Sequence, residues 1–405
     1  MCNIGQGSKY ESTNMTTNAI AEQAIEILAK LVSFDTTSEK PNLECINYIK
    51  KYLEEYNIQS HIVYEDDIHA NLFATVGADE IFPKSQNGIM FAGHTDVVPV
   101  SDQKWTNNPY ELTRKDGKLY GRGAVDMKGF IACVLAMVPH FLNATDRIEK
   151  FFHISCTSSE ETSMKGANIL ADDLVAKKFK PRWTLVGEPT SFTAITQHKG
   201  QSVFKTRVTG IAAHSSIPHS GVSAIEVMNK VINILISVSK KRAENPYKDS
   251  LFKLPYTTLN LGVIQGGSAE NIVADKCSLL WEIRTHPKDT DEAFLKEAEA
   301  LIDREILHSS MNINKAKIET EQIVKILPFT GNTANTGAKE LRKVKEDLLE
   351  TTRDYVTEAG VYQKLGADVV VYGPGSVNSA HIADEFIEET QIYEFIKMLK
   401  KMLIS

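Results

Sequence analysis

The chain has 405 residues, of which 42% are hydrophobic and 24% charged, and its formal net charge is −7 at pH 7. Because this length exceeds what a single core usually holds, we expect two domains. The acidic balance argues against a nucleic-acid partner, which needs a basic face on the protein. The five cysteines are scattered and odd in number, which favours a reducing compartment over a disulfide framework.

The start of the chain is polar and lacks the apolar core of a secretory signal, so residues 1–15 are predicted to be a disordered lead. The most apolar run covers residues 130–138, far fewer than the roughly 20 residues that span a bilayer. We therefore expect no membrane partner and a cytoplasmic location.

Strands and helices alternate in the first half of the chain. Hydrophobic periodicity predicts helices at residues 19–32, 42–56 and 127–142. Strands are predicted at residues 61–65, 71–77, 88–93, 150–160 and 182–190. This alternation indicates an α/β domain with a mixed sheet flanked by helices. Its polar motifs follow the strand ends, where open α/β sheets bind their ligands.

The order then changes to strand, helix, strand, strand, helix, strand. These elements are predicted at residues 202–210, 223–240, 257–267, 277–286, 291–307 and 313–324. The βαββαβ order is that of a ferredoxin-like domain. We expect it to be inserted at residues 198–323, between two parts of the first domain at residues 16–197 and 324–405. The second part holds helices at 338–349 and 390–403 and a strand at 367–373.

Side chains with metal-binding chemistry recur just after the predicted strands. Taken alone, His94 is more often a structural histidine, and an isolated acid after a strand is usually a helix cap or a solvated loop residue. The recurrence of such residues after several strands favours a metal site, because strand ends on one edge of a sheet converge in space. Imidazoles and carboxylates together suit two zinc ions, with cobalt or manganese as substitutes. The candidate ligands and their neighbours are His94, Asp96, Asp126, Glu160, Glu161, Glu188 and His381.

Several motifs, in this order, resemble those of the M20 metallopeptidase family of dinuclear zinc amidohydrolases. They are GHTDVVP, GRGAVDMKG, SSEET followed by GANIL, GEPT, and GPG with a later AH. The likeness covers residues 93–388 and extends into the inserted domain, through AHSS with GVSAIEVM and through LPYTTLNLGVIQGG. There the chain looks like the family members that deacetylate N2-acetyl-L-ornithine. The resemblance implies that the inserted domain acts as a lid and dimerisation domain.

The resemblance also implies a role for each residue of the metal set. His94 is the first histidine ligand, with Asp96 behind it as a catalytic support, and Asp126 bridges the two metals. Glu160 is the general base. The remaining metal ligands are Glu161, Glu188 and His381.

Outside the metal set, the resemblance implies that His214 stabilises the oxyanion, from the neighbouring subunit in dimeric members. Asn271 and Arg284 would hold the substrate carboxylate, with a surface salt bridge as the alternative role of Arg284. Gly375 would approach the substrate by its backbone. Glu358 resembles a substrate-side acid, with a helix-surface glutamate as the alternative.

The activity implied is metal-dependent hydrolysis of N2-acetyl-L-ornithine to L-ornithine and acetate, in arginine biosynthesis, by a homodimer formed through the inserted domain. One alternative is another N-acyl amino acid, above all N-succinyl-diaminopimelate, or a dipeptide. A different class of protein, a catalytically silent metal-binding protein, is a further alternative. Glu160 argues against it, because a silent protein has no need of a free base beside a ligand.

Overall fold

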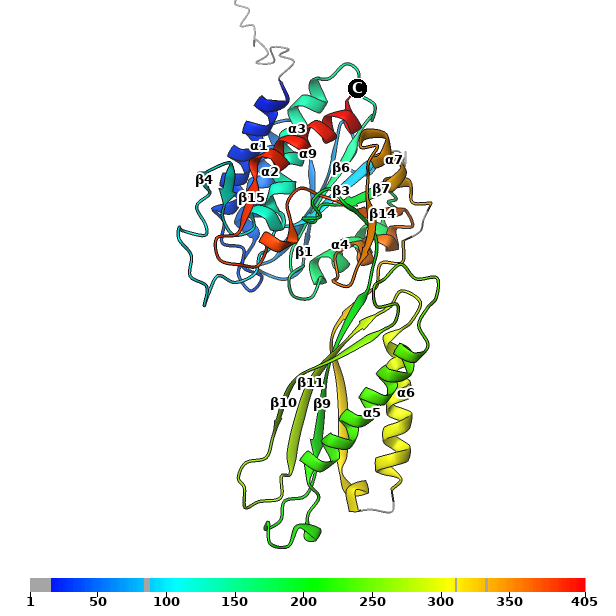
Figure 1. Ribbon diagram of the computed structural model, residues 1–405. Coiled ribbons are helices and arrows are strands. Elements are labelled where there is room, and N and C mark those ends of the chain that lie inside the picture. The colour runs from blue at the N-terminus through cyan, green and yellow to red at the C-terminus, as the bar shows by residue number, and fades with distance from the viewer. Residues whose placement is uncertain (1–15, 84–87, 310–311, 332–333, 405) are drawn as a thin grey trace, which may run out of the picture. The chain divides into compact units, whose positions relative to one another are not determined.

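The computed structural model describes residues 16–83, 88–309, 312–331 and 334–404, and the predicted disordered lead lies outside these residues. The contacts divide the chain into two compact units (Figure 1). Unit 1 comprises Met1–Ala194, Ala334–Glu350 and Tyr362–Ser405, and unit 2 comprises Ile195–Thr333 and Thr351–Val361. Unit 2 therefore includes residues 324–333 and 351–361, for which the sequence showed no separate signal.

The centre of unit 1 is a mixed sheet that contains the strand order β1-β2-β6-β3-β7-β14. The strands are β1 (Ser60–Tyr64), β2 (Ala70–Val76), β6 (Phe152–Thr157), β3 (Ile89–His94), β7 (Trp183–Val186) and β14 (Asp368–Val371). β6, β3, β7 and β14 run parallel to one another, whereas β2 pairs antiparallel with both β1 and β6. Every residue of β3 and β6 is buried, as expected for strands covered on both faces.

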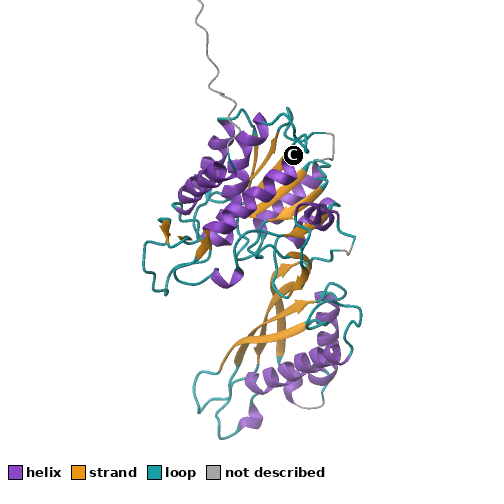
Figure 2. Cartoon of the chain, turned by 45° about the horizontal axis from the view of Figure 1, so that its top comes forward, coloured by secondary structure: helices purple, strands orange, loops and turns teal. Residues whose placement is uncertain are grey.

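Helices flank these strands (Figure 2). They are α1 (Thr17–Val32), α2 (Leu43–Glu54), α3 (Gly129–Asn143), α4 (Lys165–Ala176), α7 (Thr336–Val344) and α9 (Glu389–Leu403). α1, α3 and α9 pack on one another, and α4 packs against β1, β2 and β6. Among the described residues, Ala124–Asn143 is long and apolar enough to cross a membrane, but 83% of its most apolar window is buried in the protein, as in a core helix.

A small antiparallel sheet joins distant parts of unit 1. Its strands are β4 (Thr113–Lys115), β5 (Lys118–Tyr120) and β15 (Phe386–Glu388), in the order β15-β5-β4. The pairing of Phe386 with Tyr120 places the segment after His381 beside the segment that leads to Asp126. The sheet thus aligns two segments that carry candidate ligands.

Unit 2 has the predicted βαββαβ order. Its elements are β9 (Gly200–Thr209), α5 (Ala224–Glu244), β10 (Thr258–Gly266), β11 (Lys276–Thr285), α6 (Asp291–Ile302) and β12 (Lys317–Ile326). The strands form an antiparallel sheet in the order β10-β11-β9-β12, which is the ferredoxin-like arrangement. One face of β9 and β11 is buried with the two helices, through Phe204, Val208, Leu279 and Trp281. The predicted fold of the inserted domain is therefore confirmed.

Candidate metal centre

Two histidines and two acids from separate segments of unit 1 meet at the carboxyl ends of its parallel strands. His94 is the last residue of β3, is fully buried, and places Nε2 3.1 Å from Oδ1 of Asp126. Nε2 of His381 lies 3.2 Å from Oδ2 of Asp126 and 3.1 Å from Oε1 of Glu161. Asp126 therefore presents one oxygen to each histidine.

The His94–Asp126 contact fits two ligands of one cation. Nδ1 of His94 lies 2.9 Å from the backbone oxygen of Asp96 and donates its proton there, so Nε2 of the neutral ring is an acceptor. Two acceptors would then face each other, unless a proton or a cation lies between them. Two ligands about 2.0–2.1 Å from a tetrahedral zinc are roughly 3.3 Å apart, close to the observed separation.

The carboxylates beside the two histidines raise the pKa of both rings. Burial lowers the pKa of His94, but hydrogen bonds with Asp126 and Asp96 outweigh it and raise this pKa well above its ordinary value. The pKa of His381 rises to about 10, because Asp126 and Glu161 bind its ring. The histidine–carboxylate contacts thus favour positive charge at this place, which a divalent metal would supply.

The remaining carboxylates crowd against the same cluster. Burial raises the pKa of Glu160 well above its ordinary value, and the charges of Glu188 and Glu161 raise it further. Burial also raises the pKa of Glu161. Glu188 is buried just after β7. Several carboxylates forced together in a buried site are stabilised by a divalent cation, so the donor set fits the predicted metals.

Asp96 holds the turn that carries both glutamates. It is buried, and its two carboxylate oxygens accept the backbone N–H groups of Glu160 at 3.0 Å and Glu161 at 3.2 Å. The hydroxyl of Ser38 donates to it at 2.7 Å. Asp96 thus contacts His94 on one side and fixes the direction of Glu160 and Glu161 on the other, as outer partners of metal ligands do.

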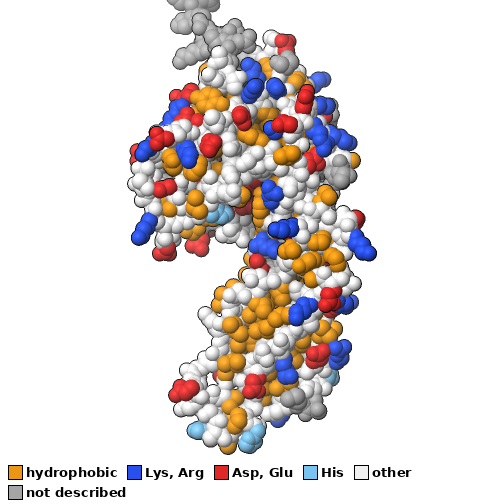
Figure 3. All heavy atoms as spheres, in the orientation of Figure 1, with side chains coloured by type: hydrophobic (Ala, Val, Ile, Leu, Met, Phe, Trp, Pro, Cys, Tyr) orange, Lys and Arg blue, Asp and Glu red, His pale blue; other side chains and the backbone are white. Residues whose placement is uncertain are grey.

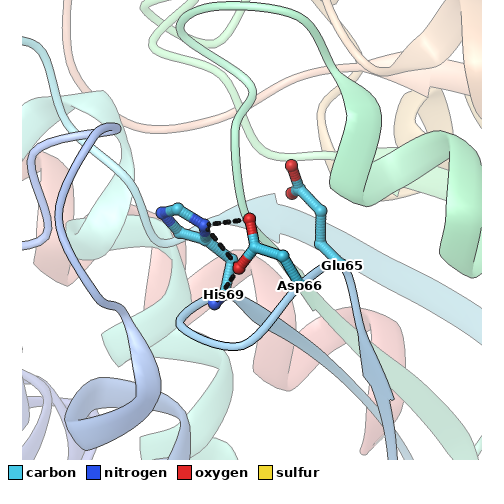
Figure 4. A group of neighbouring side chains, drawn as sticks. All are labelled: Glu65, Asp66 and His69. Carbon is cyan, nitrogen blue, oxygen red and sulfur yellow. Dashed lines mark hydrogen bonds and ion pairs between the residues drawn. The ribbon is translucent and has the colours of Figure 1, made fainter.

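A second group of possible ligands, Glu65, Asp66 and His69, lies near this turn (Figure 4). Figure 4 shows His69 against Asp66, with Nδ1 2.9 Å from Oδ2, while Glu65 points away from the pair. Glu65 instead accepts hydrogen bonds from the hydroxyls of Ser158 at 2.8 Å and Ser159 at 2.7 Å. The contacts of this group are therefore those of a loop that supports the turn before Glu160.

The predicted oxyanion donor, His214, lies in an exposed loop of unit 2. The backbone N–H of Ser216 donates to its Nδ1 at 3.1 Å, which requires that nitrogen to be an acceptor. The proton of the neutral ring is therefore on Nε2. Asn271 is adjacent, because its carbonyl accepts from the N–H of Ser215 at 3.1 Å and Ile272 pairs with His214. The structure thus brings His214 and Asn271 together in unit 2.

The other predicted substrate contacts have partners of their own. In β11, Nη2 of Arg284 lies 3.3 Å from Oε2 of Glu282. Gly375 has φ +91°, and an added Cβ would meet Val125 at 2.2 Å, so only glycine fits there. Its backbone N–H donates to the side chain of Gln391. The substrate roles of these residues stay predictions. Glu358 is fully buried in unit 2, so the helix-surface alternative for it is wrong.

The chain matches the model of Peptidase family M20/M25/M40 over residues 90–405. It is 32% identical over 388 residues to an acetylornithine deacetylase from Buchnera aphidicola subsp. Acyrthosiphon pisum (strain Tuc7), covering 94% of this chain and 97% of that one. It is 35% identical over 360 residues to an acetylornithine deacetylase from Proteus mirabilis (strain HI4320), covering 87% of each chain. The fold and the clustered ligands are those of a metal-dependent amidohydrolase. The chain belongs to peptidase family M20/M25/M40, which confirms the predicted family.

Solved structures share the fold along nearly the whole chain. A tripeptidase from Staphylococcus aureus matches with a TM-score of 0.70 at 20% identity, covering 94% of this chain and 98% of that one. An M20 family metallo-carboxypeptidase from Sulfolobus solfataricus matches with a TM-score of 0.71 at 16% identity and the same coverage. These matches confirm the predicted fold class, a mixed α/β domain with an inserted second domain.

Proposed function

We propose that this enzyme hydrolyses N2-acetyl-L-ornithine to L-ornithine and acetate, as a step of arginine biosynthesis in the cytoplasm. The observation that carries the proposal is the similarity to acetylornithine deacetylases, at 32% identity over 94% of this chain in one case. The aligned length is too great to leave out either unit, so the similarity includes the predicted lid. An N-acyl amino acid is therefore the substrate class, and acetylornithine the particular substrate.

For the metals, we propose two zinc ions, with cobalt or manganese as substitutes, and Asp126 shared between them. The proposal is supported by the contacts of Asp126, which directs Oδ1 toward His94 and Oδ2 toward His381. Glu161 belongs to the His381 side, where it contacts that ring, and Glu188 completes the set. Bound metals of this kind lower the pKa of water and polarise a carbonyl.

Glu160 is the proposed general base. Its carboxylate takes the proton from the water that attacks the amide carbonyl carbon, and it passes this proton to the nitrogen as the C–N bond breaks. Burial raises the pKa of Glu160 well above its ordinary value, which strengthens the carboxylate as a proton acceptor. Asp96 orients it through the backbone N–H of Glu160.

Unit 2 supplies three of the proposed substrate contacts, and Gly375 in unit 1 is the fourth. His214 presents Nε2–H as a donor, and one donor to an oxyanion contributes about 2.7–4 kcal/mol to the transition state. Asn271 and Arg284 are proposed to bind the substrate carboxylate, as amide and guanidinium groups do. Gly375 is proposed to face the substrate with its backbone.

We propose that the enzyme is a homodimer formed through unit 2, with His214 acting in the neighbouring subunit. Hydrophobic side chains gather on unit 2 in the space-filling view (Figure 3). Val263 and Ile264 on the edge strand β10 are 50% and 54% exposed, and Ile225 at the start of α5 is 45% exposed. An unpaired edge strand beside apolar side chains is a surface that a second copy can cover.

The test compares two substrates under identical conditions. Protein supplied with zinc or cobalt is given N2-acetyl-L-ornithine or N-succinyl-diaminopimelate, with the Glu160→Gln protein as the blank. We expect a higher kcat/KM for the acetylated substrate. A preference for the succinylated substrate would contradict the proposed substrate and keep the reaction class, while turnover of neither would contradict the proposed function.

A further inference from the structure

A buried ion pair lies against the backbone that presents Asp126. The side chains of Arg122 and Glu385 are each 1% exposed, and Nη1 of Arg122 donates to Oε2 of Glu385 at 2.5 Å. The other oxygen of Glu385 accepts the backbone N–H groups of Val125 at 3.1 Å and Asp126 at 3.3 Å. Glu385 is thereby bonded directly to the turn that offers Asp126 to both histidines.

The same guanidinium is connected to the segment of the second ligand. Nη2 of Arg122 donates to Oε1 of Gln103 at 2.6 Å, and Nε2 of Gln103 donates to the backbone oxygen of His381 at 2.9 Å. Since Glu385 follows His381 by only four residues, these contacts close a ring of hydrogen bonds. The ring contains the backbone of both Asp126 and His381.

Other contacts fix Gln103 in this ring. The indole Nε1 of Trp105 donates to Oε1 of Gln103 at 3.3 Å, and the Trp105 ring lies 5.1 Å from the guanidinium carbon of Arg122. One residue further on, the carboxylate of Asp384 accepts the N–H of Thr106 at 2.8 Å and its hydroxyl at 2.7 Å. Residues 103–106 are therefore held against residues 381–384 at several points.

A buried ion pair is by itself weak evidence for a role in stability, because the cost of desolvating both charges offsets much of their attraction. Here the hydrogen bonds around the pair lead to the two segments that carry Asp126 and His381. Metal ligands tolerate errors of only about 0.5 Å in position, so such a link between ligand segments affects binding.

We propose that Glu385, Arg122 and Gln103 are positioning residues that set the distance between Asp126 and His381 for metal binding. This inference rests on the proposed metal site. The three residues act through the backbone of the ligands and are not ligands themselves, because both oxygens of Glu385 are occupied by protein donors.

The test uses the full chain and measures affinity for Co²⁺ and Zn²⁺ by competition with a chromophoric chelator. Glu385→Gln keeps the size of the side chain, but its NH₂ group must face either Arg122 or the backbone N–H groups. We expect affinity to fall by about 10- to 100-fold and the Co²⁺ absorption spectrum to change. Gln103→Met keeps the length and removes all three hydrogen bonds of the Gln103 side chain, so its affinity should fall in the same direction.

Glu149→Gln is the matched control. Glu149 is a buried partner of Arg182, and the two precede β6 and β7, at the opposite ends of these strands from the ligands. This variant should have a lower apo melting temperature and wild-type metal affinity. If Glu385→Gln does not fold, the metal affinity of Gln103→Met tests the proposal. Gln103 is partly exposed, so we expect this variant to fold.

Wild-type affinity and spectrum in Glu385→Gln and Gln103→Met would overturn the proposal. So would a loss of apo stability with no change in affinity, which is the result expected of a purely structural pair. A wild-type protein that binds neither metal would overturn the metal site itself and, with it, this inference. Turnover of a different substrate would leave the inference intact, because the readout is metal affinity.

Discussion

Asp126 directs Oδ1 toward Nε2 of His94 at 3.1 Å and Oδ2 toward Nε2 of His381 at 3.2 Å, so a single carboxylate lies between the two imidazoles. The two histidines come from parts of unit 1 that lie before and after unit 2 in the sequence. A carboxylate between two histidine nitrogens is suited to bridge two metal ions about 3.5–4 Å apart.

Glu160 and Glu161 are neighbours with different predicted tasks, so matched substitutions should separate them. Glu160→Gln should reduce kcat by about 10²- to 10⁴-fold and leave metal content unchanged, because it removes only proton transfer. Glu161→Gln should lose metal affinity, because its Oε1 contacts His381 at 3.1 Å. Kinetics together with metal analysis of both variants checks this. Loss of metal from Glu160→Gln, or full activity in it, would remove Glu160 from the role of base.

Asp96→Asn should disturb both glutamates together. Asp96 accepts the N–H groups of Glu160 and Glu161 on separate oxygens, whereas asparagine offers one oxygen and an NH₂ group that faces a donor. We expect metal affinity and kcat to fall by about 10- to 100-fold. Ser38→Ala, which removes a single donor to Asp96, should have a smaller effect. Equal effects of the two variants would show that the N–H contacts do not matter.

His214 can be tested by mixing two inactive proteins. His214→Gln and Glu160→Gln are each expected to lose most activity. If His214 acts across a homodimer, the heterodimer has one intact site, and random mixing should restore about a quarter of wild-type activity. The measurement is the rate after the two proteins are mixed under conditions that allow subunit exchange. With exchange verified, activity no higher than the sum of the separate proteins would contradict action across the dimer.

His153 should make the protein less stable in acid. Burial among aromatic rings, including those of Phe73 and Phe179, lowers the pKa of His153 from 6.5 to about 3. Its contribution to stability is therefore complete above pH 6.5 and is lost as pH falls toward 3. In His153→Phe, the free energy of unfolding should fall less steeply below pH 6.5, by up to about 1.4 kcal/mol per pH unit. Urea unfolding of the metal-free proteins at several pH values tests this, and parallel pH curves would contradict it.

Much of the fold follows from local patterns. The strand that ends at His94 is a continuous apolar run, because both of its faces are covered. In unit 2 the period-2 alternation of β9 and β11 and the helical periods between the strands predicted the βαββαβ order. Most of the candidate ligands could be found for the same reason, since His94, Glu161 and Glu188 lie at or just after the ends of strands that are easy to recognise.

The parts that could not be predicted lack a local signal. β4, β5 and β15 have three residues each, too few to show a period. α4 buries mainly small residues, Gly166, Ala167 and Ala171, which blur its apolar stripe. Arg122 and Glu385 are 263 residues apart, and their pairing depends on the small sheet that unites them. In the sequence, the only indication of this ion pair is that two oppositely charged residues lie close to predicted ligands.

The central claim is that metal held by this cluster makes the protein a deacetylase. The most direct measurement is acetate release from N2-acetyl-L-ornithine by chelator-treated protein as Zn²⁺ or Co²⁺ is titrated back. The account predicts no release before metal is added, and release that rises with bound metal in the wild type but not in Glu160→Gln. Acetate release that is independent of metal, or a fully loaded wild-type protein that releases none, would contradict it.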